Sequence, residues 1–350
     1  MQKKIEVIDF LKGYSMLSIV IYHIGQQLIL PGVVGHMIDF GGTGVHTFIF
    51  VSGFGLYLSH LRRPLPFVAF LKKRFSKIYV PYVVTVVVSA LIALVVPIYP
   101  VSAFAFFGHI FLYKMFFADI MGSYGYQLWF MSTIIQLYFL FLPLAWMKGR
   151  MKDGVFLLTG IAVSVGWGIL VVAMGDASLR NYNGAFLLYV WEFMLGMALA
   201  GKFFRDGYEF WRLRVIYLVL LSIGGIACYG LMALEFGAYG RLLNDVPALV
   251  GYTCLSILIY RLGVVWLNRF VLFASKFSYA LFLVHILVLQ LIILLAGRLG
   301  LAYTWVLGLG TLAVCLVAGF WADKFFSWLD GLLFSRGRDA GGGEGARAGG

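Results

Sequence analysis

Runs of about twenty apolar residues recur along almost the whole of this 350-residue chain. A helix needs about twenty such residues to cross the roughly 30 Å hydrocarbon core of a bilayer. Only 12% of the residues are charged, about half the share that soluble domains carry. The runs are too long, and alternate too little, for the strands of about ten residues that build an outer-membrane barrel. The sequence therefore predicts an all-α, polytopic membrane helix bundle.

Polar and glycine-rich joints divide the chain into about ten expected transmembrane helices. Their ranges are 8–29, 44–60, 78–98, 127–147, 154–174, 185–201, 214–234, 246–262, 277–296 and 301–322. The aromatic stretch 101–126 could be an interfacial helix, a re-entrant segment or a further span. The first two are favoured, because an eleventh span would reverse every later loop against the distribution of charge. We expect residues 1–334 to form one membrane domain and the Gly- and Arg-rich residues 335–350 to form a disordered tail.

The basic residues predict how the bundle is oriented. If both termini are cytoplasmic, all but four of the 27 Lys and Arg residues lie on the cytoplasmic side, the exceptions being Lys114, Arg180, Arg241 and Arg298. The positive-inside rule therefore favours cytoplasmic termini. The same sorting explains the net charge of +12 as a topology signal, so we expect no nucleic-acid partner.

The first expected helix carries Asp9, Lys12 and His23 on one face. Lys12 and His23 are eleven residues apart, about three turns and about 16 Å of rise. Ionisable groups at bilayer depth usually face a protein interior or a water-filled cavity, because exposing them to lipid is unfavourable. Since imidazole exchanges protons near neutral pH, His23 is a candidate general base in the outer half of the membrane. The alternative is a hydrogen-bonded interior histidine.

Several segments carry a recognisable pattern in a fixed order. Ten residues separate Lys12 from His23, residues 48–54 read Phe-Ile-Phe-Val-Ser-Gly-Phe, and residues 73–82 read Lys-Arg-Phe-Ser-Lys-Ile-Tyr-Val-Pro-Tyr. Together they resemble the acyltransferase-3 family, integral membrane acyltransferases that modify cell-surface polysaccharides and other acceptors. Weaker matches at 128–130, 191–197 and 277–285 extend the resemblance over nearly the whole membrane region. Lys12 and Lys77 stand where Arg is common in the family, and they keep the charge but lack the planar fork of Arg.

The resemblance implies a membrane acyltransferase domain over residues 1–334, in the bacterial inner (cytoplasmic) membrane. It would move an acetyl or similar acyl group from cytoplasmic acyl-CoA to a hydroxyl of an extracytoplasmic glycan or lipid-linked sugar. His23 would be the general base, and the pair Asp9 and Lys12 would hold the lower part of the donor channel. The implied partners are membrane lipid, acyl-CoA and the glycan acceptor, and no tightly bound cofactor is expected.

The resemblance also gives a role to the basic segment after the second expected helix. Lys73, Arg74 and Lys77 would contact the phosphates of acyl-CoA in a cytoplasmic loop, for which cationic side chains are natural partners. The alternative is an ordinary positive-inside signal.

A further set of residues could line the substrate cavity. Single ionisable groups in apolar spans are functional candidates by default, and aromatic side chains could shape an acceptor groove. Helix packing, polar packing and an interfacial aromatic belt are the alternatives. The candidates are Ser52, Trp129, Tyr138, Glu192 and His285. No metal site is expected, because the spacing of His36, Asp39 and His46 matches no metal motif.

A proton-coupled transporter or flippase is the competing class, since ten spans with buried Lys, Glu and His also fit a carrier. Such carriers often consist of two related halves, and no internal symmetry is apparent in this sequence. A non-catalytic membrane scaffold is disfavoured, because an inert helix has no reason to retain three aligned ionisable groups.

Overall fold

The computed structural model describes residues 5–334, so the predicted tail 335–350 lies outside the described residues. Every regular element in this range is a helix, which confirms the all-α bundle. The long helices are α1 (Glu6–Gly25), α3 (Gly44–Arg62), α5 (Val80–Val95), α8 (Trp129–Arg150), α9 (Asp153–Met174), α11 (Phe186–Asp206), α12 (Val215–Leu243), α13 (Asp245–Arg261), α15 (Ser278–Arg298) and α16 (Trp305–Phe334). The shorter elements are α2 (Gly32–Gly41), α4 (Phe67–Arg74), η1 (Phe75–Tyr79), α6 (Ala103–Ile110), η2 (Tyr113–Phe116), α7 (Ala118–Met121), η3 (Tyr126–Leu128), α10 (Arg180–Asn183), η4 (Phe210–Arg212) and α14 (Val265–Ser275).

Eight helical stretches among the described residues are long and apolar enough to cross a membrane. The other two expected spans correspond to α3, with 19 residues, and α13, with 17. The count of ten spans and the cytoplasmic placement of both termini remain predictions. The stretch 101–126 forms only short helices, the longest being the eight residues of α6. Because eight residues rise only about 12 Å, α6 cannot be an eleventh span.

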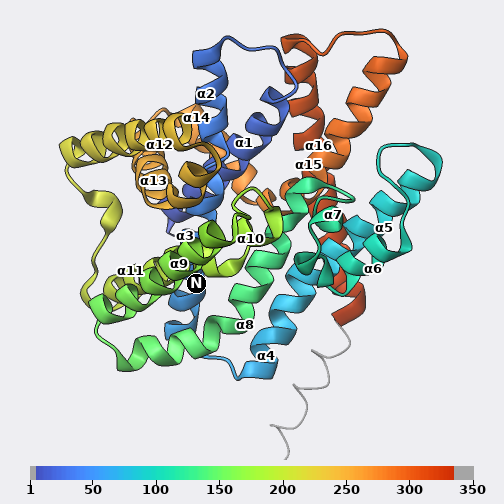
Figure 1. Cartoon of the computed structure of the whole chain (residues 1–350). Helices are drawn as coiled ribbons and strands as arrows, with labels where there is room; N and C mark the ends of the chain where they lie inside the picture. Colours follow the sequence, from blue (N-terminus) through green and yellow to red (C-terminus); the bar gives the residue numbers. More distant parts are fainter. Residues whose placement is uncertain (1–4, 335–350) are drawn as a thin grey trace, which may run out of the picture.

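Helix α1 lies at the centre of the bundle. It contacts α2, α3, α13, α14, α15 and α16 (Figure 1). Gly13 allows part of this packing, because a side chain there would collide with the backbone carbonyl of Val271 on α14. Helix α1 therefore lies among other helices, although the side chains of Asp9 and Lys12 on it are about one-third exposed.

Two facing glycines bring α3 and α11 close together. A Cβ atom on Gly53 would lie 2.9 Å from the carbonyl carbon of Phe193, and one on Gly196 would lie 2.8 Å from the backbone nitrogen of Phe54. Small residues on both sides of a helix pair allow the two backbones to approach. This approach places the start of α3 beside Glu192 of α11.

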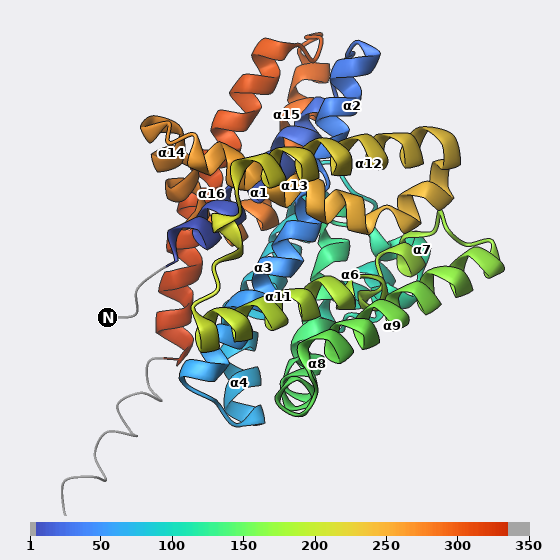
Figure 2. The ribbon, with the colours of Figure 1, turned by 90° about the vertical axis from the view of Figure 1, so that its left-hand side faces the viewer.

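The basic segment that was expected to be a loop is helical, so that prediction was wrong. Helix α4 continues through the π-helical turn η1 into α5, and Lys72, Lys73 and Arg74 form its last turn. Pro81 lies at the start of α5 and has no N–H to donate to the α-helical ladder, which explains a local change of hydrogen-bond pattern. In both views α4 lies at the opposite end of the bundle from α2 (Figures 1 and 2).

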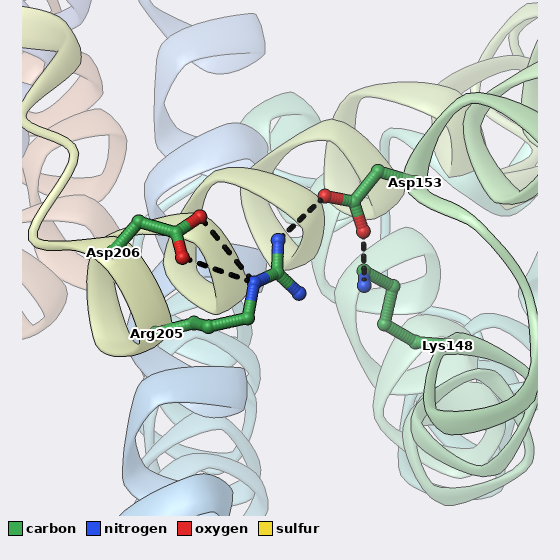
Figure 3. A network of polar contacts seen from close by, with 4 residues as sticks. All are labelled: Lys148, Asp153, Arg205 and Asp206. Carbon is green, nitrogen blue, oxygen red and sulfur yellow. Dashed lines mark hydrogen bonds and ion pairs between the residues drawn. The ribbon is translucent and has the colours of Figure 1, made fainter.

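An ion-pair network joins three helices at the end of the bundle near α4. Lys148 of α8 is buried, and its Nζ lies 2.5 Å from Oδ1 of Asp153 at the start of α9. Nη2 of Arg205 on α11 lies 3.2 Å from the other oxygen of Asp153, and its Nε pairs with Asp206 (Figure 3). Asp153 also lies at the positive end of the α9 dipole, so it stabilises this junction in two ways.

Candidate active site

His23 lies on the last turn of α1, half-buried and turned toward the interior of the bundle. Its ring centroid is 4.9 Å from that of Tyr126, in an edge-to-face contact. The ring of His285 on α15 stacks on its other side, with centroids 5.4 Å apart. The ring is therefore held between η3 and α15 inside the bundle, and it is half-buried.

The contact with Gln26 determines which ring nitrogen of His23 carries the hydrogen. The side-chain oxygen of Gln26 lies 3.3 Å from Nδ1 of His23, and Nε2 of Gln26 donates to the hydroxyl of Tyr22 over 2.8 Å. Because the Gln26 oxygen can only accept, Nδ1 carries the hydrogen in this arrangement and Nε2 keeps its lone pair. The sequence analysis missed Gln26, although its position three residues after His23 on the same face was a usable signal.

His285 offers a second imidazole in the same state. Its Nδ1 lies 2.8 Å from the carbonyl oxygen of Phe282 and 3.1 Å from that of Leu281, so Nδ1 again carries the hydrogen. The Nε2 atom is buried without a hydrogen-bond partner among the described residues. Since a buried acceptor without a partner is unfavourable, this atom is well suited to receive a hydrogen bond from a bound molecule.

The segment before α8 organises the surroundings of His23. Tyr124 and Gly125 both have positive φ, 56° and 128°. After this turn Tyr126 packs on His23, and Gln127 donates from Nε2 to the carbonyl of Leu283 over 3.1 Å, two residues before His285. A strained backbone that is held in place by its neighbours is typical of functional sites.

Lys114 anchors this segment from behind. It is fully buried, and Nζ donates to the carbonyl oxygen of Leu128 over 2.8 Å. The same Nζ lies 3.3 Å from Nδ1 of His109 and 5.3 Å from the ring centroid of Tyr82. Burial lowers the pKa of the Lys114 ammonium well below its ordinary value. The expected interfacial segment thus supplies an interior support that the sequence analysis did not identify.

Arg180 is a further cation at this end of the bundle that the sequence did not single out as a site residue. Its guanidinium carbon lies 4.8 Å from the ring centroid of Trp129, and its charge acts on His23. Trp129 is half-buried, and its ring lies 6.0 Å from that of Tyr189. The arrangement gives this end of the bundle a positively charged, aromatic surface.

A second candidate region lies between the α4–η1 segment and α8. Arg74, Tyr79 and Tyr138 line a pocket there, and Nε of Arg74 is buried without a hydrogen-bond partner among the described residues. Lys73 and Lys77 are exposed, so Arg74 is the member of the basic segment that faces the pocket. The structure thus places Tyr138 with Arg74, and Trp129 with Arg180 and Tyr189.

Helix α8 separates the two regions. Tyr126, just before α8, contacts His23, and Tyr138 contributes to the Arg74 pocket. The two positions are twelve residues apart, about 18 Å along a helix. The sequence alone does not show that the two regions are separate, because their separation depends on which helices pack against each face of α8.

The remaining candidates lie away from His23. Nζ of Lys12 is 3.7 Å from Oδ1 of Asp9, and both side chains are about one-third exposed. They precede His23 by three turns or more along α1, so this pair does not orient the imidazole. The hydroxyl of Ser52 donates to the carbonyl of Phe48 over 2.7 Å, within its own helix. Glu192 contacts His46 and not His23.

The fold and the site define an all-α integral membrane protein with a half-buried histidine inside a helix bundle. Residues 5–320 match the family described as "Acyltransferase domain", the acyltransferase-3 family. The chain therefore belongs to this family and is a membrane acyltransferase. A comparison with curated proteins and a comparison with solved structures each give no match.

Proposed function

We propose that this protein transfers an acetyl or similar short acyl group from cytoplasmic acyl-CoA to a hydroxyl of an extracytoplasmic glycan or lipid-linked sugar, with His23 as the general base. The observation that carries the proposal is the half-buried His23 ring, whose Nε2 is left free by Gln26 and which is enclosed by His285 and Tyr126. Such a base can take a hydroxyl proton near neutral pH.

The reaction would follow from these groups. The acceptor oxygen attacks the thioester carbonyl while Nε2 of His23 takes its proton, so that a C–O bond forms. The C–S bond then breaks, and the departing sulfur takes the proton back from His23. Nε2 of His285 would accept a hydrogen bond from a second donor on the acceptor, which would hold the reacting hydroxyl against His23.

Arg74 is the candidate contact for the donor's phosphates. The unpartnered, buried Nε of Arg74 is a donor available for a phosphate oxygen, and such charge-assisted hydrogen bonds are strong. The separation of about 18 Å along α8 is of the order that the long flexible arm of coenzyme A can bridge. A phosphate group at Arg74 would therefore leave the acyl group within reach of His23.

Purified protein in detergent, given radiolabelled acetyl-CoA and a panel of cell-envelope glycans, tests the proposal. We expect label on a glycan, and His23→Ala should lower the rate by about 10²- to 10⁴-fold. His36→Ala is the matched control, because His36 is an exposed histidine on α2. A folded His23→Ala protein with near-normal turnover would exclude this base. Accumulation of a substrate in vesicles without acyl-CoA would instead indicate a carrier.

A further inference from the structure

A buried cluster of three ionisable groups lies apart from His23. His46 lies in the first turn of α3, Glu192 lies on α11, and Asp245 is the first residue of α13. All three side chains are buried, and one ligand atom from each lies within 4.8 Å of the other two. Three helices that are distant in sequence thus bring one imidazole and two carboxylates to one point.

The distances within the cluster are close to those of a metal site. Nδ1 of His46 is 2.7 Å from Oε1 of Glu192, and Nε2 of His46 is 3.8 Å from Oδ1 of Asp245. Ligand atoms that bind one ion at about 2.1 Å lie about 3.0–3.5 Å apart in octahedral or tetrahedral geometry. Small side-chain rotations would therefore bring one atom of each residue onto a common ion.

The net negative charge of the cluster favours binding of a cation. Two buried carboxylates leave a net negative charge even if His46 is protonated, and no described Lys or Arg forms an ion pair with either carboxylate. A divalent ion beside a neutral imidazole would bring the total charge to zero. Uncompensated charge in an apolar interior is strongly unfavourable, so this neutralisation would stabilise the folded state.

One atom of the cluster has no partner. Glu192 is fully buried, and its Oε2 has no hydrogen bond among the described residues, although Oε1 contacts His46. A buried carboxylate oxygen is normally hydrogen-bonded or bound to a metal. Oε2 is thus a vacant acceptor in the middle of the cluster.

We propose that His46, Glu192 and Asp245 bind one divalent transition-metal ion, of the kind that one imidazole and two carboxylates suit, such as Zn²⁺ or Mn²⁺. The ion joins α3, α11 and α13. This proposal differs from the sequence-based expectation of no metal site, which considered only nearby residues, whereas these three ligands lie 146 and 53 residues apart and form no motif.

The full chain, purified in detergent without metal-affinity steps, tests this directly by elemental analysis. We expect about one Zn²⁺ or Mn²⁺ per chain after dialysis, and at least a tenfold loss in Glu192→Gln and Asp245→Asn. His36→Ala is the control for surface binding and should retain the ion. Equal metal content in wild type and both variants, or loss only in His36→Ala, would overturn the proposal.

A measurement on the wild-type protein covers the case in which the variants do not fold. A strong chelator should lower the thermal midpoint, and Zn²⁺ or Mn²⁺ added back should restore it, because a ligand that binds only the folded state stabilises it. A midpoint that neither the chelator nor the added ions shift would refute the site, and His46 would then be a hydrogen-bonded clamp between two carboxylates.

Discussion

The approach of α3 to α11 makes a sharp prediction for Gly53→Ala. The new methyl group would collide with the carbonyl of Phe193, whose carbon would lie only 2.9 Å away. The carbonyl carbon and oxygen of Phe193 belong to the backbone of α11, so they cannot move aside as the end of a flexible side chain could. The helices must therefore move apart, and overpacking of this kind lowers the free energy of unfolding by about 1–3 kcal/mol.

Gly55 provides the matched control on the same helix, because a Cβ atom there would have no heavy atom within 4 Å. Gly55→Ala should leave stability unchanged or raise it by up to about 1 kcal/mol, since alanine favours a helix over glycine. The free energy of unfolding of both variants can be measured by denaturant titration in mixed micelles. If Gly53→Ala is as stable as Gly55→Ala, the close packing of α3 on α11 described above is wrong.

Three further predictions concern the other polar features. Arg74→Gln should raise the KM for the acyl donor about 10- to 100-fold, because it removes a charge-assisted hydrogen bond. Lys73→Gln is the control, because Lys73 is exposed, and it should change the KM little. Equal KM values for the two variants in steady-state kinetics would count against the Arg74 pocket. Lys114→Met should lower kcat about tenfold or more and leave the KM for the donor unchanged. The carbonyl of Leu128 loses its hydrogen-bond donor, so Tyr126 shifts relative to His23. An unchanged kcat would show that Lys114 does not position the site. Asp153→Asn should lower the free energy of unfolding by about 1–2 kcal/mol. The loss is smaller than that expected for a fully buried ion pair, because Asp153 is partly exposed. Lys152→Gln, at the exposed neighbouring position, serves as the control.

The helices could be predicted from the sequence because they depend on local information. Twenty-residue apolar runs follow from the thickness of a bilayer, and the register of Lys12 with His23 follows from helical geometry. The π-turn over Phe75–Tyr79 could not be predicted with confidence from Pro81, since a proline at the start of a helix is also compatible with a loop before it.

The partners of each polar group depend on contacts between distant segments. His285 meets His23 across 262 residues, and Glu192 meets His46 across 146. A single sequence shows that each group is costly at membrane depth but not which neighbour satisfies it. For that reason the sequence did not show that Tyr138 lies with Arg74, or that Lys114 is buried against the carbonyl of Leu128.

The partner of His23 also bears on the chemistry. A carboxylate beside Nδ1 would stabilise the imidazolium, whereas Gln26 is neutral and orients the ring without doing so. In the proposed reaction, a proton taken by His23 would have no carboxylate beside Nδ1 to stabilise it, so the sulfur that leaves the thioester would be the natural group to receive it. A site arranged in this way would favour transfer in which the acceptor hydroxyl loses its proton as the donor thiol gains one, without a long-lived charged histidine.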